Sequence, residues 1–158
     1  MKSVDSLESL IRWTRVGTNA AHRALQDCMD RLVGIFRVQA DLEAAVETLE
    51  ALKHRAAAVR VEGTRMFNPG WHLARDLSNM ICVSEAIARS AALRKESRGS
   101  HSRLDFPGQD SALAQVNFRV TRSASGMRVE PTPLPQMPAE LRALFDAKPA
   151  PAKQEAAR

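Results

Sequence analysis

Residues 68–95 read NPGWHLARDLSNMICVSEAIARSAALRK, and this stretch decides the fold class of the chain. Asn68 is placed to cap a helix that begins at Pro69, where the missing proline N–H is not needed. Residues at three- and four-residue spacing then line one face: Leu73, Leu77, Met80, Ile81, Ser84, Ile87, Ala88 and Ala91. Four charged residues are expected off that face: Arg75, Asp76, Glu85 and Arg89. The pattern predicts one long amphipathic helix that ends near Lys95.

Two earlier segments show the same spacing. A stripe within residues 19–34 consists of Ala21, Leu25, Cys28, Met29 and Leu32. A stripe within residues 40–58 consists of Leu42, Ala45, Val46, Leu49, Leu52 and Ala56. Isolated helices of this length are marginal in water, so the three stripes must pack against one another. We therefore predict an all-α fold built on an antiparallel three-helix bundle.

The apolar period changes to two after residue 107. Val116, Phe118 and Val120 alternate with polar residues, and Gly126 marks a turn before a second short run, which predicts a small β-hairpin. Prolines at 131, 133, 135 and 138 predict an extended, Pro-rich tail. The expected organisation is a lead-in helix over 1–18, the bundle over 19–107, the hairpin and proline strap over 108–145, and a disordered tail over 146–158.

Composition excludes several functions. The net charge of +5 permits binding to nucleic acid, anionic lipid or an acidic protein surface and selects none of them. Aromatic residues make up only 4% and no nucleic-acid-binding module is recognisable, so no nucleic-acid partner is expected. Since no apolar run is long enough to span a bilayer, we expect a cytoplasmic chain without direct membrane insertion.

The sequence also lacks the usual cofactor and metal motifs. The seven glycines are isolated from one another, so no loop of the pyrophosphate-binding type is present. Cys28 and Cys82 lack metal-ligand spacing and are both interpreted as buried thiols. No catalytic, cofactor-binding or metal-binding residue is therefore predicted.

One short run concentrates charge: residues 94–107, RKESRGSHSRLDFP. Arginine forks form two-point contacts with carboxylates and carbonyls, and Gly99 permits a turn with positive φ. Asp105 is expected to pair with Arg103 and pin the loop. His101 has serines as sequence neighbours, but adjacency does not make a catalytic triad, and hydrolysis is disfavoured. The composition favours a loop whose polar groups are satisfied by another surface over a simply solvated loop.

This run resembles the segment R-(K/T)-E-S-R-G-x-H-x-R-x-D-(Y/F)-P in the C-terminal helical domain of succinate dehydrogenase and fumarate reductase flavoproteins, with related forms in L-aspartate oxidase. Residues 25–37, with LQDCM and VGIFR, are similar to the first helix of that domain and its ending. Residues 67–80, with FNPGWH and DLSNM, are similar to the start of its long third helix. Residues 125–138 are similar to its closing hairpin and strap. The resemblance covers roughly residues 10–145.

The resemblance implies a spectrin-repeat-like bundle packed against an FAD-binding domain. FAD and the groups that hold the dicarboxylate belong to upstream domains, whose motifs are not present here, so no catalytic residue is carried over. The residues expected to lock this domain onto the flavin domain are Arg94, Glu96, Ser97, Arg98, Gly99, His101, Arg103 and Asp105. They would support two-electron transfer between succinate or fumarate and FAD without supplying the reacting groups.

An iron–sulfur subunit is a second candidate partner, and such partners would place the chain at the cytoplasmic face of a membrane. After Pro107 this sequence has GQDSA where the family continues R-D-D, which weakens the expectation for contacts made just beyond the motif. The alternative interpretation is a free-standing basic helical protein-interaction module. A start at Met1 fits either an excised domain or a short reading frame.

Overall fold

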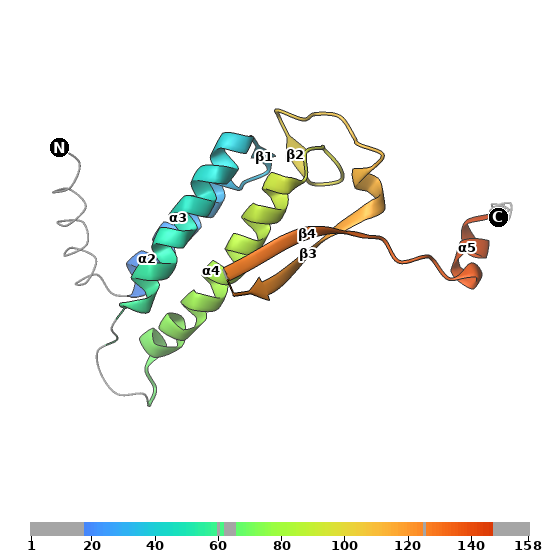
Figure 1. The fold of residues 1–158 in the computed structure, drawn as a ribbon. Helices are drawn as coiled ribbons and strands as arrows, with labels where there is room; N and C mark the ends of the chain where they lie inside the picture. The colour runs from blue at the N-terminus through green and yellow to red at the C-terminus, as the bar shows by residue number, and fades with distance from the viewer. Residues whose placement is uncertain (1–17, 60, 62–65, 125, 147–158) are drawn as a thin grey trace, which may run out of the picture.

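The computed structural model describes residues 18–59, 61, 66–124 and 126–146. The helices of this part are α2 (Thr18–Leu32), α3 (Gln39–Ala57), α4 (Pro69–Leu93) and α5 (Ala139–Asp146), with a 3₁₀ turn, η1 (Leu113–Gln115). The strands are β1 (Phe36–Arg37), β2 (Ser102–Arg103), β3 (Val116–Ser123) and β4 (Gly126–Pro133) (Figure 1). The prediction of a mostly helical chain with a small antiparallel strand pair is confirmed. The expected lead-in helix, except for residue 18, and the tail from residue 147 lie outside the described residues.

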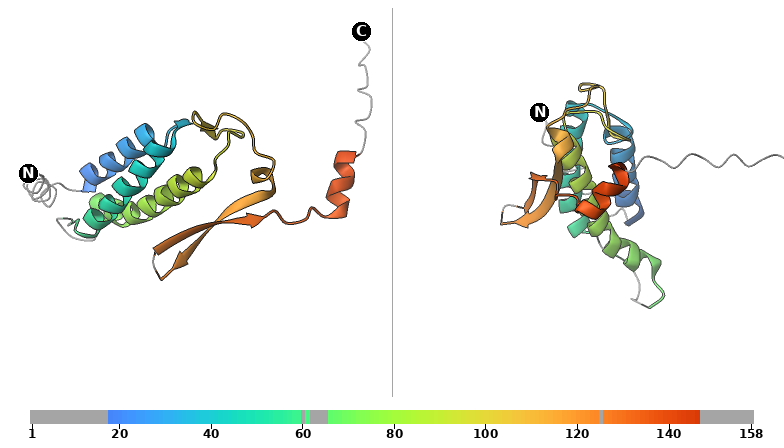
Figure 2. Two further views of the ribbon diagram at one scale, coloured as in Figure 1. Left: turned by 45° about the horizontal axis from the view of Figure 1, so that its top comes forward. Right: turned by 90° about the vertical axis from the view of Figure 1, so that its right-hand side faces the viewer.

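Helices α2, α3 and α4 lie side by side, and the chain reverses direction between successive helices (Figures 1 and 2). Their predicted apolar stripes meet in one core whose most buried members are Leu42, Leu49, Leu77 and Ile81. Burying such a side chain stabilises the fold by about 1.5–3 kcal/mol relative to leaving it in water. Hydrophobic burial between the three helices therefore holds them together.

The N-terminal end of α4 forms as its sequence predicted. The Asn68 side chain accepts a hydrogen bond from the Trp71 N–H at 3.3 Å, and Pro69 is the first helical residue. The helix ends at Leu93, two residues before the predicted end, because Arg94 already has an extended backbone with ψ of 94°. The loop that follows therefore begins directly at the predicted charged run.

Three side chains on α4 differ from the prediction. Glu85 is buried, although it was expected off the apolar face, and two cations satisfy its carboxylate. Ile87 was placed in the core stripe but is exposed. Cys82 was interpreted as buried and is exposed, whereas Cys28 is buried as expected. The eight-residue stripe is wider than the surface that α2 and α3 cover, so Ile87 at its edge faces water.

Strands β3 and β4 form an antiparallel hairpin that crosses α4. Val120 pairs with Val129, and Gly126 supports the reversal with a φ of 112°, a value that favours glycine. Beyond β4 the chain continues without regular structure to α5, which stands away from the other helices (Figures 1 and 2). No helix within the described ranges combines the length and the hydropathy that crossing a bilayer requires.

Candidate functional site: the 94–106 loop

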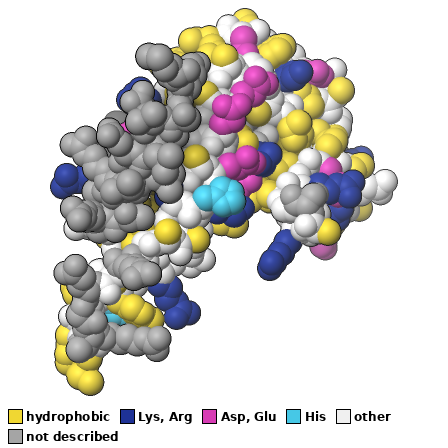
Figure 3. Space-filling view, turned by 60° about the vertical axis from the view of Figure 1, so that its left-hand side comes forward, with side chains coloured by type: hydrophobic (Ala, Val, Ile, Leu, Met, Phe, Trp, Pro, Cys, Tyr) yellow, Lys and Arg dark blue, Asp and Glu magenta, His cyan; other side chains and the backbone are white. Residues whose placement is uncertain are grey.

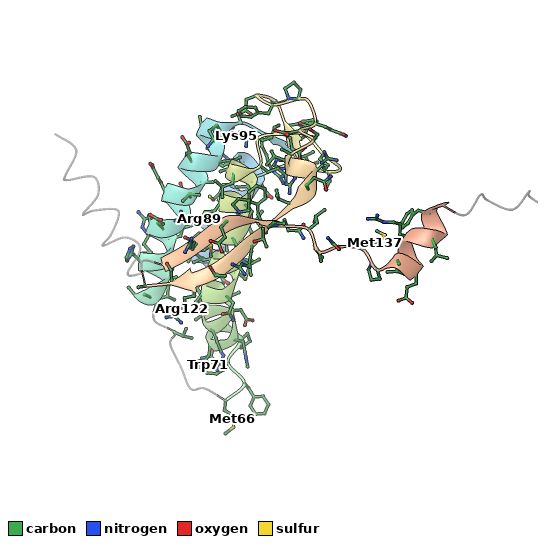
Figure 4. The ribbon with its side chains drawn as sticks, turned by 45° about the vertical axis from the view of Figure 1, so that its right-hand side comes forward. Met66, Trp71, Arg89, Lys95, Arg122 and Met137 are labelled. Atoms are coloured by element: carbon green, nitrogen blue, oxygen red, sulfur yellow. The ribbon has the colours of Figure 1, made fainter. Side chains whose placement is uncertain are left out.

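The 94–106 loop folds over one end of the helices. Lys95 marks where it leaves α4 (Figure 4). The loop returns beside the α2–α3 connection, where β1 and β2 form a two-residue parallel ladder with Phe36 opposite Ser102 and Arg37 opposite Arg103. The Leu104 N–H extends this contact by donating to the Arg37 carbonyl at 2.9 Å. The sequence did not predict this ladder, which joins segments more than sixty residues apart.

Arg103 caps the C-terminus of α4 from inside the protein. Its guanidinium is fully buried, and Nη1 donates to the carbonyls of Ala91 at 2.9 Å, Ala92 at 3.4 Å and Arg94 at 3.3 Å. The last carbonyls of a helix have no partner within the helix and carry its negative dipole end. A cation in this place therefore satisfies both requirements, and it comes from a residue ten positions after the helix ends.

Asp105 caps the N-terminus of α3, as Arg103 caps the C-terminus of α4. Its carboxylate accepts from Nε and Nη2 of Arg103, each at 2.8 Å, in a two-point contact. It also accepts the backbone N–H of Gln39, the first residue of α3, at 2.8 Å. The Arg103 hydrogen bonds hold the pKa of the Asp105 carboxyl far below its usual range. One ion pair thus caps two helix ends of opposite polarity, and the predicted pairing of Asp105 with Arg103 is present.

Glu96 is the second buried charge of the loop. Its carboxylate accepts from Arg98, with Nη2 at 3.1 Å, from Arg94, and from the Asp110 N–H at 2.8 Å. The Arg98 hydrogen bonds, opposed by burial, dominate in lowering the pKa of Glu96 to about 2. Glu96 is therefore an ionised anchor that gathers the beginning of the loop and the segment after it.

Ser97 and Gly99 shape the backbone between these charges. The Ser97 hydroxyl accepts the Arg103 N–H at 2.8 Å and donates to the Phe106 carbonyl at 2.9 Å. Arg98 and His101 exchange backbone hydrogen bonds, and Gly99 makes the turn between them at a φ of 59°. The predicted glycine turn is present.

His101 is held on both ring nitrogens. Arg37 Nη1 lies 2.7 Å from His101 Nδ1, and because a guanidinium can only donate, Nδ1 must accept. The other nitrogen, Nε2, then carries the proton and donates to the Arg94 carbonyl at 3.1 Å. Burial, reinforced by the nearby arginines against the Arg94 hydrogen bond, lowers the pKa of His101. The ring is a neutral bridge between β1 and the end of α4, and neither nitrogen is free to act as a base.

Arg94 links the loop to the hairpin. Its guanidinium donates to the carbonyls of Leu113 at 3.1 Å and Val116 at 3.0 Å, and lies 4.9 Å from the centre of the Phe118 ring. It is also the second partner of Glu96. The loop, η1 and the start of β3 consequently behave as one hydrogen-bonded unit.

The loop brings all eight predicted residues together, but their polar groups find partners within the chain. Among the described residues, every buried side-chain nitrogen and oxygen has a hydrogen-bond partner. No cluster of histidine, cysteine and acidic residues in the same part of the chain is suited to hold a metal ion. The arrangement therefore fixes backbone geometry, and the docking role expected for these residues stays a prediction.

The outer surface of this region is apolar. Ile35, Phe36 and Leu104 are each at least 64% exposed; Phe36 lies on β1, and Leu104 directly follows β2 and donates its N–H to the Arg37 carbonyl. We call these three residues the β1–β2 patch. Exposed apolar side chains held on a rigid backbone are typical of a contact surface. Sequence reasoning missed the patch because it concentrated on the charged residues between its members.

A second charged network lies between α3 and α4 and was also missed. Lys53 Nζ is 3.2 Å and Arg89 Nε is 2.8 Å from the Glu85 carboxylate, and Arg89 also pairs with Glu50. Burial raises the pKa of Glu85, but hydrogen bonds from Arg89 and Lys53 outweigh it, so the pKa lies below its usual value. The four-residue spacing from Glu85 to Arg89 was the available signal.

The remaining surface offers shallow hollows and mixed charge. One pocket of about 510 Å³ lies at the hairpin turn and includes Lys53, Cys82 and Met127 in its lining. Another of about 440 Å³ lies between α2 and α4 and includes Leu25, Met29 and Val83. On the face drawn in Figure 3, acidic side chains lie among hydrophobic ones, and Lys and Arg are scattered. The described side chains visible on that face form no continuous basic surface of the kind that nucleic acid needs.

Comparison with known proteins gives a consistent result. The family described as fumarate reductase flavoprotein C-term matches residues 22–144. The fumarate reductase flavoprotein subunit of Mycobacterium tuberculosis is 34% identical over 103 residues, which are 65% of this chain and 18% of that protein. The corresponding subunit of Haemophilus influenzae is 39% identical over 83 residues, which are 52% and 14% of the two chains.

A solved structure extends the match to the fold. A chain of Mycobacterium smegmatis Sdh1 in complex with UQ1 aligns with a TM-score of 0.70 and 35% identity, over 91% of this chain and 26% of that one. The present chain thus spans less than a fifth of the length of these two curated relatives.

Proposed function

Because the chain belongs to the family of fumarate reductase flavoprotein C-terminal domains, we propose that it braces the flavin-bearing part of such a flavoprotein. In this proposal, FAD and the groups that act on succinate or fumarate lie in the rest of the flavoprotein. This chain contributes no reacting group to the two-electron transfer. Its role is to hold a contact surface in place, next to the flavin-bearing part and, as a second partner, an iron–sulfur subunit at the cytoplasmic face of a membrane.

The observation that carries the proposal is the contrast between buried charges and exposed apolar side chains at the 94–106 loop. Two of its charged side chains, Arg103 and Glu96, are fully buried, while the three residues of the β1–β2 patch are exposed. Apolar area removed from water contributes about 25 cal/mol per Å², so three large exposed side chains are a substantial driving force for association. The buried charges keep the backbone rigid, and this backbone holds the three apolar side chains in place.

This refines the roles of the predicted docking residues. Arg103, Glu96 and Ser97 act indirectly, since their polar atoms are already engaged within the chain. Direct contact falls to the β1–β2 patch and to Gly99, which is exposed at the tip of the loop. We infer that the spectrin-repeat-like bundle over 19–107 is the rigid support, and that the hairpin and strap over 108–145 are joined to it through the hydrogen bonds of Arg94.

A charge placed in the patch tests the proposal. Phe36→Glu and Leu104→Glu should each weaken the hold of this domain on the flavin-bearing part, measured as flavin retained by the purified flavoprotein. Val83→Glu is the matched control, because Val83 is comparably exposed and lies ten residues before the end of α4, about 15 Å along the helix axis. Circular dichroism of the 158-residue chain should be the same for all three variants.

The proposal that this chain supplies no reacting group has its own measurement. The 158-residue chain purified alone should show no flavin absorbance and no fumarate reduction. Bound flavin with turnover in that chain would refute the proposal. Full flavin retention in both patch variants would refute the contact surface instead.

A further inference from the structure

The helix α5 presents an apolar face that the rest of the described chain does not cover. Leu144 and Phe145 are 70% and 79% exposed, and Met137 and Leu141 are also exposed. Figure 4 shows Met137 on the segment that leads into α5, well clear of Arg89 on α4 and of Lys95 just after that helix. Within α5, Leu141, Leu144 and Phe145 have the spacing i, i+3 and i+4, which places them along one side of the helix, and Met137 lies two residues before its start.

That spacing is the one by which amphipathic helices bind in grooves. An apolar helix face enters an apolar groove through anchors at i, i+3, i+4 and i+7. A helix of eight residues is marginal in water by itself, so α5 depends on something that covers this face. The charged residues of α5 are Glu140, Arg142 and Asp146, which are nearly balanced, and so the apolar side chains would dominate such an interaction.

The segment before α5 holds it at a defined distance. The strap begins where the Leu134 N–H donates to the Gln115 carbonyl at 2.9 Å, and α5 begins where the Pro138 carbonyl accepts the N–H groups of Leu141 and Arg142 at 3.0 Å. Prolines at 135 and 138 stiffen the connection, since proline-rich segments are extended and semi-rigid. A stiff connection reduces the conformational entropy lost when the helix binds.

The root of the strap is joined to the 94–106 loop. Gln115 ends η1, and Arg94 donates to the carbonyls on either side of it, those of Leu113 and Val116. The same guanidinium pairs with Glu96 in the loop. The β1–β2 patch and α5 are thus two apolar surfaces carried by one hydrogen-bonded unit.

We propose that α5 is a second anchor, which binds an apolar groove on the flavin-bearing part of the flavoprotein. The inference rests on the proposed function and adds a second contact to it. The family match includes α5 as far as residue 144, so this helix belongs to the shared domain. The curated relatives are more than five times longer than the segment matched in this chain, so most of the polypeptide that could cover α5 lies outside this chain. Two linked contacts raise overall affinity far above either alone.

Hydrogen exchange tests the inference in the intact flavoprotein, with the 158-residue chain alone as reference. The amides of residues 141–145 should exchange at least about tenfold more slowly in the flavoprotein than in the free chain. The double substitution Leu144→Glu with Phe145→Glu should abolish this protection. It should also weaken the hold of this domain on the flavin-bearing part by roughly 100-fold, measured as before by flavin retention. Arg142→Ala, on the polar side of the same helix, should leave both unchanged.

The possible results separate this inference from the proposed function. Protection at Phe36 and Leu104 with none at α5 would overturn the second anchor and leave the proposed function standing. Protection at neither surface would overturn both. Protection of α5 in the free chain that grows with its concentration would show that a second copy covers the helix, and would also overturn the inference.

Discussion

Two of the described regions that contain arginine–carboxylate pairs differ in their surroundings. In the 94–106 loop, the side chains of Arg103 and Glu96 have no exposed surface. In the β3–β4 hairpin, Arg119 and Arg128 pair with Glu130 while their own side chains are 60% and 67% exposed. The pairs share their chemistry, yet only those in the loop satisfy backbone groups that water cannot reach. Burial, and not the number of ion pairs, therefore determines what each region contributes.

The largest effect is expected at Arg103. Arg103→Met leaves the buried α4 carbonyls and the 27%-exposed Asp105 carboxylate without their partner, which should destabilise the fold by about 3 kcal/mol, the lower end of the range for a buried pair. Urea unfolding followed by circular dichroism measures the loss. Arg128→Met in the hairpin is the matched control and should barely change the midpoint. Equal losses from the two substitutions would erase the contrast between the regions.

Glu96 should make stability depend on pH in an acidic window. Its pKa is about 2 in the folded chain against 4.5 for an ordinary glutamate, so the unfolded chain takes up the proton first. The stabilisation is complete above about pH 4.5 and is lost as the pH falls toward 2. Glu96→Gln should flatten that part of the stability profile, and a profile unchanged by the substitution would contradict the assignment.

Glu85 lies between the two extremes, because it is buried but its partner Lys53 is exposed. Glu85→Gln should cost about 1–3 kcal/mol, since Arg89 then loses a charged acceptor while Lys53 returns to water. Thermal unfolding measures the change, and Glu50→Gln, on the exposed side of Arg89, is the control. A loss as large as that of Arg103→Met would show that partial exposure of a partner does not matter.

Backbone shape gives a smaller effect that involves no charge. Gly99→Ala forces a side chain onto a residue with a φ of 59°, which costs about 1–2 kcal/mol, although no atom lies within 4 Å of the new methyl group. Gly108→Ala also has open space but no positive φ, and should be neutral or slightly stabilising. Differential scanning calorimetry of the two variants isolates backbone strain from packing.

The smallest effect is expected in the hairpin itself. Arg119→Ala removes an exposed ion pair to Glu130, which surrounding water already screens. The shift in the urea midpoint should be close to the measurement error and should disappear at high salt. A large shift that persists at high salt would mean that the hairpin pair is as important as the loop pairs.

The spacing of apolar residues predicted the helices well, because it indicates which side of each helix is buried. Local patterns also located the Asn68 cap, the Gly99 turn and the pairing of Arg103 with Asp105, all of which depend on neighbours in sequence. They did not predict Arg37 and Gln39 as partners of the loop, since those contacts span 64 residues. The inward direction of the charges was missed for the same reason: spacing along the chain does not show which helix ends lie nearby.

The parallel ladder between β1 and β2 has a consequence for the order of folding. Phe36 and Ser102 are joined by a crossover that contains α3 and α4, so their pairing closes a loop of more than sixty residues. Contacts of such large sequence separation tend to form after the folding transition state, where local helix contacts come first. Substitutions that disrupt the 94–106 loop should accordingly increase the unfolding rate and leave the refolding rate nearly unchanged. The loop thus affects the lifetime of the folded domain more than the rate at which the domain folds.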